Sequence, residues 1–158
     1  MNKETIDIPP DGFMLFPCND HPAVAGIDEA GRGALAGPVV AGACILPCTL
    51  FRRRASLSCW SPFKKKTDPD CLIADSKQLT PEERDRAYAW IMEHCTTGVG
   101  IVSAERIDEI GILAANQMAM RLALARLREK STPGLLLVDG KDAFSFDCPH
   151  RSIIRACS

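Results

Sequence analysis

The sequence predicts an α/β fold in which a mixed five-stranded sheet is flanked by helices. Short apolar runs typical of strands come first along the chain, segments with helical periodicity follow, and a buried-strand pattern comes after them. The 158 residues, of which 46% are hydrophobic and 25% charged, suffice to bury one core. We therefore predict one globular domain over residues 23–158, preceded by a flexible polar leader over residues 1–22.

Two apolar runs near the start of this domain predict an antiparallel hairpin. They cover residues 24–27 and 39–46, and a glycine-flanked turn at residues 31–33 lies between them. The stretch 49–71 that follows carries runs of arginine and lysine with little apolar periodicity. It is interpreted as a basic surface insertion, either simply solvated or a phosphate-binding arm.

A capping box predicts where the first helix begins. Thr80 is placed to cap the helix, Pro81 occupies the first helical position and Glu83 the third. We expect a helix over residues 81–94. Its buried face should follow the helical period and contain Ala87, Trp90, Ile91 and Cys95.

The second half of the chain supplies the remaining elements. Residues 99–103 read as a strand, and Ser103 can cap a short turn after it. Strong helix formers over residues 112–129 predict a long helix. Residues 135–138 lack alternation, which is typical of a strand buried on both faces, and 152–155 predict a fifth strand. The residues that mark one face of the long helix are Ala114, Met118, Arg121, Leu122 and Ala125.

Composition argues against several classes of protein. The longest uncharged apolar stretch is broken by glycine and proline and falls short of the roughly 20 residues that a membrane helix needs. The first 20 residues lack the basic-then-apolar order of a secretory signal, so we expect a cytoplasmic protein. The chain has eight cysteines, and no two of them have the Cys-x-x-Cys spacing that is typical of zinc ligands. We therefore expect free thiols rather than a zinc site. Because the net charge is −1, any contact with nucleic acid must be local.

Three acidic residues follow apolar strand segments. Asp28 and Glu29 come after the first run, and Asp139 comes after the buried run. A carboxylate at a buried strand end costs free energy unless a cation or hydrogen bonds compensate, although Asp139 alone could simply begin a turn. If the first and fourth strands are neighbours, Asp28 and Asp139 converge and can share one or two Mg²⁺ or Mn²⁺ ions.

Glu29 requires a separate argument, since neighbouring residues of a strand point to opposite faces. It can join Asp28 only through the strand's end or a local twist. Two ions held by these acids would activate water and stabilise the leaving oxygen in phosphodiester hydrolysis. The turn Gly31-Arg32-Gly33 offers close backbone approach to a sugar 2′-hydroxyl and a guanidinium for phosphate, although the same residues also suit a tight hairpin turn.

The run Gly-Ile-Asp-Glu-Ala-Gly-Arg-Gly-Ala-Leu-Ala-Gly-Pro-Val-Val at residues 26–40 resembles the signature of the ribonuclease HII family, with Ala34 where the family usually has proline. Three further segments resemble motifs of that family, namely residues 74–79, 107–113 and 137–140. The resemblance implies a ribonuclease H-like fold, in a chain that lacks the family's C-terminal helices.

The resemblance also implies an activity and a site. It implies an endonuclease that hydrolyses the RNA strand of RNA-DNA hybrids, including embedded ribonucleotides, with Mn²⁺ or Mg²⁺. Nucleic acid is then the partner, and neither a membrane nor a protein partner is implied. The residues that match the family's metal-binding catalytic acids are Asp28, Glu29 and Asp139. Those that match its substrate-binding positions are Gly31, Arg32, Gly33 and Lys77.

The sequence departs from the family near its end, where Cys157 stands in place of the fourth catalytic aspartate. A thiol is a soft ligand and substitutes poorly for a carboxylate on Mg²⁺. We therefore expect weak cleavage or none by this chain alone. Two alternatives stay open: a remnant that binds hybrid without cleaving it, and a module that keeps only the fold.

Overall fold

The computed structural model describes residues 6–7, 23–34, 36–47, 76–140 and 144–154. The chain divides into two compact units, one formed by Met1–Ile45 with Thr96–Ser158 and the other by Leu46–Cys95. The predicted leader except for two residues, the predicted basic insertion and Cys157 lie outside the described residues.

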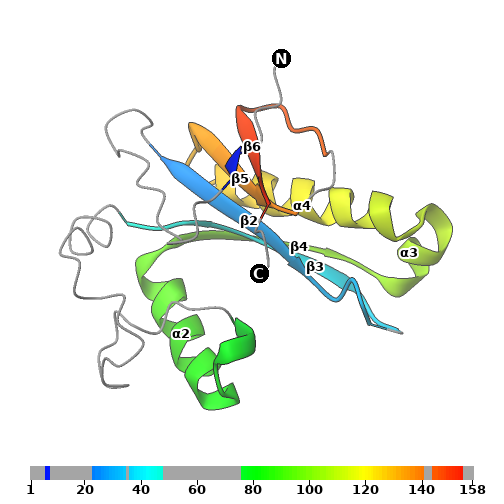
Figure 1. Cartoon of the computed structure of the whole chain (residues 1–158), viewed down its shortest axis with the longest axis horizontal. Coiled ribbons are helices and arrows are strands. Elements are labelled where there is room, and N and C mark those ends of the chain that lie inside the picture. Colours follow the sequence, from blue (N-terminus) through cyan, green and yellow to red (C-terminus); the bar gives the residue numbers. More distant parts are fainter. Residues whose placement is uncertain (1–5, 8–22, 35, 48–75, 141–143, 155–158) are drawn as a thin grey trace. The chain divides into compact units, whose positions relative to one another are not determined.

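The first unit contains a mixed sheet with the strand order β1-β6-β5-β2-β3-β4 (Figure 1). The strands β2, β3 and β4 pair antiparallel, whereas β2-β5, β5-β6 and β1-β6 pair parallel. The five predicted strands are present, and the two-residue β1 adds a sixth. The strands are β1 (Ile6–Asp7), β2 (Val24–Ala30), β3 (Val39–Ile45), β4 (Thr96–Val102), β5 (Leu135–Asp139) and β6 (His150–Ile154).

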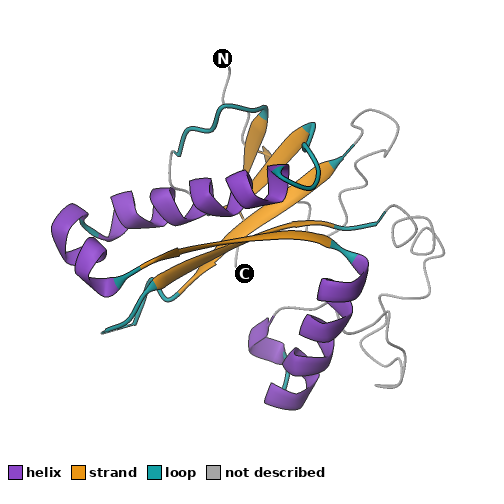
Figure 2. Ribbon diagram, turned by 180° about the vertical axis from the view of Figure 1, so that it is seen from behind, coloured by secondary structure: helices purple, strands orange, loops and turns teal. Residues whose placement is uncertain are grey.

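Two helices of this unit follow β4: α3 (Ala104–Ile110), capped by the Ser103 side chain as predicted, and α4 (Ile112–Arg128). Helix α4 runs along one face of the sheet (Figure 2) and packs mainly on β3 and β4. Two glycines of β4 allow this close packing. A Cβ on Gly98 would lie 2.2 Å from the Ala123 carbonyl oxygen, and one on Gly100 would lie 2.0 Å from that of Ala119.

The face of α4 that the sequence pattern marked is not the face that packs on the sheet. The marked residues Ala114, Met118, Arg121, Leu122 and Ala125 are all exposed. The helix is rich in alanine and leucine on several sides, so periodicity alone leaves its rotation open. The side that faces the sheet is the one whose backbone, at Ala119 and Ala123, lies against the glycines of β4. The face that is buried contains Ala115, Asn116, Ala119, Met120, Ala123, Leu124 and Leu127.

The second unit contains the short 3₁₀ helix η2 (Ser76–Gln78) and helix α2 (Pro81–His94). The predicted capping box is confirmed: the Thr80 hydroxyl accepts a hydrogen bond from the Glu83 amide at 3.2 Å, and the Thr80 amide donates to Glu83 Oε2 at 2.9 Å. On the predicted inner face Ala87 is buried, and the other three residues are half-buried. None of the helices in the described ranges is long and apolar enough to cross a membrane.

Candidate metal and nucleic-acid site

The register of β2 and β5 brings two of the predicted acids to neighbouring positions. The two strands are parallel neighbours, and Ile27 is paired with Val138. Asp28 and Asp139 each come one residue later, so they occupy adjacent positions on the same face of the sheet. Both residues are exposed. From the sequence, Asp28 and Asp139 were expected to converge if the first and fourth predicted strands are neighbours. These strands are β2 and β5, and they are neighbours.

The face of the sheet that carries Asp28 is the one opposite α4. Ile27 is buried, and the alternation along β2 places Gly26 and Asp28 on the other side. Asp28 is paired across the strands with Gly42 of β3, and a Cβ at either glycine would meet no atom within 4 Å. Asp28 Oδ1 accepts a hydrogen bond from the Glu29 amide at 2.7 Å. Among the described residues, nothing therefore covers the two glycine positions beside this carboxylate.

Glu29 does not join the other two acids. The predicted apolar run of the first strand stopped at residue 27, before the acids. In the structure β2 continues to Ala30, because Glu29 and Ala30 pair with β3. Glu29 therefore lies on the α4 side of the strand, where its side chain is 14% exposed and forms an ion pair with Arg32 at 3.1 Å. Within the described ranges, no three histidine, cysteine, aspartate or glutamate side chains gather to hold a metal ion.

The turn after β2 contains Gly31, Arg32 and Gly33, and its two glycines differ in their surroundings. Gly31 has a φ of 93°, and a Cβ there would lie 2.5 Å from the Pro38 carbonyl oxygen, so the turn itself requires glycine. A Cβ on Gly33 would meet nothing within 4 Å. The hairpin-turn interpretation therefore accounts for Gly31, and Gly33 leaves its backbone accessible to a ligand.

Lys77, the remaining predicted substrate contact, belongs to the second unit. It lies exposed on η2. This short helix is fastened by Arg84 of α2, whose Nη1 donates to the carbonyl oxygens of Ser76 at 3.1 Å and Leu79 at 2.7 Å.

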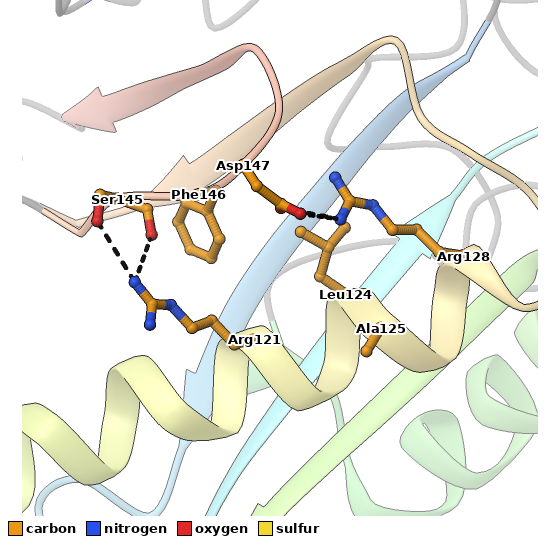
Figure 3. Close-up of a pocket in the computed structure, with 7 residues that line it drawn as sticks. All are labelled: Arg121, Leu124, Ala125, Arg128, Ser145, Phe146 and Asp147. Carbon is orange, nitrogen blue, oxygen red and sulfur yellow. Dashed lines mark hydrogen bonds and ion pairs between the residues drawn. The ribbon is translucent and has the colours of Figure 1, made fainter.

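A groove of about 540 Å³ beside α4 was not predicted (Figure 3). Arg121 Nη2 donates to the Ser145 carbonyl oxygen at 3.1 Å, and Arg128 Nη1 donates to both Asp147 carboxylate oxygens at 2.8 Å. Both guanidinium groups thus bind the segment between β5 and β6. That segment matches no recognisable motif, so no sequence pattern predicted the groove. Its lining residues are Arg121, Leu124, Ala125, Arg128, Ser145, Phe146 and Asp147.

The ion pair in this groove should make the segment pH-sensitive. Hydrogen bonding to Arg128 lowers the pKa of Asp147 below its usual value. A lowered folded-state pKa stabilises the fold at pH values above the ordinary aspartate pKa, and that contribution is lost as the pH falls through the lowered pKa. We expect amide protection of residues 144–148 in hydrogen exchange to fall in acid, and Arg128→Ala to show the lower protection already at neutral pH. Identical protection in both proteins would contradict this.

Comparison with known proteins defines the fold first. No family profile matches the chain. The ribonuclease HII of Archaeoglobus fulgidus, solved as a complex with PCNA, covers 82% of this chain with a TM-score of 0.57 and 24% identity, over 61% of its own length. A Bst-RNase HIII solved with Mn²⁺ covers 82% of this chain with a TM-score of 0.52 and 19% identity, over 44% of its own length. The chain therefore has a ribonuclease H-like fold.

Sequence comparison then identifies the relatives. The ribonuclease HII of Chlamydia trachomatis is 51% identical over 119 residues, which are 74% of this chain and 46% of that protein. The ribonuclease HII of Chlamydia pneumoniae is 41% identical over 138 residues, which are 86% of this chain and 55% of that protein. The chain is a homologue of ribonuclease HII, as the sequence motifs predicted, and spans about half the length of these curated relatives.

Proposed function

We propose that the chain is a metal-dependent endonuclease that hydrolyses the RNA strand of RNA-DNA hybrids, including duplexes with embedded ribonucleotides. One observation carries the proposal: Asp28 and Asp139 occupy adjacent positions on one face of the sheet, and both residues are exposed. Homology to ribonuclease HII supports the choice of substrate.

Two adjacent carboxylates suit a hard divalent cation, Mn²⁺ or Mg²⁺, which prefers oxygen ligands. Asp28 and Asp139 would hold it, and the Mn²⁺ found with a ribonuclease HIII of the same fold supports this choice. When bound, the ion supplies an activated water and offsets negative charge on the leaving oxygen. Glu29 is the proposed third acid. It joins only when its ion pair with Arg32 opens and the end of β2 twists out of its pairing with β3, which brings its side chain to the face of Asp28.

The substrate contacts proposed for this chain follow from exposure and chemistry. Gly33 is open enough for its backbone to meet a sugar 2′-hydroxyl, the group that distinguishes RNA from DNA. The guanidinium of Arg32, in the turn that directly follows β2, matches a phosphate in geometry and charge. Lys77, which is exposed on η2, is proposed as a further phosphate contact.

Cleavage of a labelled duplex with one embedded ribonucleotide tests the proposal. In Mn²⁺ we expect slow cutting on the 5′ side of the ribonucleotide, because Cys157 stands in place of the fourth acid, and none in EDTA. Asp28→Asn should lower the rate at least about 100-fold, because it removes a charged metal ligand. Asp85→Asn, which neutralises an exposed aspartate of α2 outside the family motifs, is the matched control and should leave the rate unchanged.

A gel-shift measurement on the same duplex separates the alternatives. Folded protein that binds the hybrid and never cuts it would contradict the proposed hydrolase and support a binding-only protein. Folded protein that shows no preference for hybrid over plain DNA duplex would contradict both and leave a module that retains only the fold.

A further inference from the structure

Strand β4 forms one end of the sheet and, within the described part of the chain, pairs only with β3. Its sequence, Thr-Thr-Gly-Val-Gly-Ile-Val, contains neither a charge nor a proline. Natural edge strands usually carry such residues, because unpaired N–H and C=O groups recruit other strands. Near the start of the strand, Lys130 Nζ donates a hydrogen bond of 2.9 Å to the Thr97 carbonyl oxygen.

Apolar side chains border this edge on both faces of the sheet. Val99 is 46% exposed and Ile101 60% exposed on the face away from α4. On the α4 side, Leu122 is an exposed large hydrophobic residue whose Cβ would lie 2.8 Å from a Cβ on Gly100. Met118, also exposed, precedes Leu122 by one helical turn. An apolar surface around a strand edge fits an added strand better than it fits nucleic acid.

We propose that this edge is an interface with a second copy of the chain, in which the two β4 strands pair antiparallel about a two-fold axis at Gly100. In this register Val99 lies opposite Ile101 of the second copy, and Ile101 lies opposite its Val99. Both cross-strand pairs are then apolar and β-branched, which favours pairing. The same residues contribute from each side, as a two-fold interface requires.

The charges beside the strand favour the same arrangement. Lys130 lies at the start of β4, where it contacts Thr97, and Glu105 lies in the first turn of α3, just after the end of β4. Antiparallel pairing brings the start of one strand to the end of the other. Lys130 of each copy therefore approaches Glu105 of the second copy, and the two opposite-charge contacts occur symmetrically. Parallel pairing would place like charges together.

Sedimentation velocity of the reduced 158-residue chain tests this proposal, which does not rest on the proposed function. An interface of one strand and its flanking residues is small, so we expect a monomer-dimer equilibrium with a dissociation constant in the micromolar range. Ile101→Lys should raise that constant at least about tenfold, because it places a charge opposite an apolar residue. Leu113→Lys, at a residue 54% exposed on α4, is the matched control and should leave it unchanged.

A charge exchange tests the orientation of the strands. Lys130→Glu and Glu105→Lys should each weaken the dimer about threefold, and the two changes combined should restore it. Circular dichroism confirms that each variant is folded. A folded monomer at every micromolar concentration, a dimer insensitive to Ile101→Lys, association beyond the dimer, or no restoration by the combined charge exchange would each overturn the proposal.

Discussion

Asp139→Asn should lower metal-dependent cleavage of a ribonucleotide-containing duplex at least about 100-fold. The substitution replaces a charged oxygen ligand by a neutral amide next to Asp28, where the proposed cation is held. Asp139 is exposed at the end of β5, so the fold should not depend on its charge. Single-turnover rates at saturating Mn²⁺ measure the effect directly, since they exclude product release.

Asp147→Asn is the control for that experiment. Asp147 is also an exposed aspartate of the first unit, but it binds Arg128 in the groove rather than Asp28. We expect its neutralisation to leave the cleavage rate within about threefold of the original, because it removes no proposed metal ligand. Equal losses of cleavage rate in the two variants would show that Asp139→Asn acts through the overall charge of the protein or the stability of its fold, and not through a metal ligand.

Gly100→Ala should destabilise the fold by about 3 kcal/mol, at the upper end of the cost of overpacking a core. The new Cβ would lie 2.0 Å from the Ala119 carbonyl oxygen and 2.6 Å from the Ala123 amide nitrogen. Both are backbone atoms of α4, so no side-chain rotation can relieve the clash. The helix would have to move away from the sheet. Urea unfolding followed by circular dichroism measures the free energy of unfolding.

Gly42→Ala provides the matched comparison on the neighbouring strand. Gly42 is exposed in β3, and a Cβ there would meet no atom within 4 Å. The substitution should change the free energy of unfolding by less than about 1 kcal/mol, as expected of a surface change without strain. A similar loss of stability in both variants would contradict the account of how α4 packs on β4.

Local signals in the sequence predicted much of this fold. The capping box of Thr80 and Glu83 specifies the start of α2 within a few residues, and the glycine turn at Gly31 specifies the hairpin of β2 and β3. The unbroken apolar run before Asp139 predicted a buried strand, and β5 is that strand. In each case the deciding interactions lie close together in the sequence, so a short window contains them.

Tertiary contacts decided what local patterns could not. The rotation of α4 depends on Gly98 and Gly100, which lie in a different element from the helix they contact. The length of β2 likewise depends on β3, which supplies hydrogen-bonding partners beyond the apolar run. The pairing with β3 keeps Glu29 inside a regular strand and on the face away from Asp28.

The candidate site was predictable in part. The proximity of Asp28 and Asp139 followed from one assumption, that their strands are neighbours, and the sheet order confirms that assumption. The ion pair of Glu29 with Arg32 was not predicted, because the sequence motifs assigned Glu29 to a metal ion and Arg32 to a phosphate. The groove beside α4 was not predicted. One of its sides is the loop segment Ser145–Asp147, which has neither a periodic pattern nor a motif.

The most direct test of whether Asp28 and Asp139 hold one cation together is to measure the affinity of the chain for Mn²⁺. Free Mn²⁺ can be measured by electron paramagnetic resonance for the original chain, Asp28→Asn, Asp139→Asn and the double variant. Each single substitution should weaken binding at least about tenfold, and the double variant should lose little more, since either change already breaks the shared site. Losses that simply add, or unchanged binding in either single variant, would contradict a cation held jointly by the two strands.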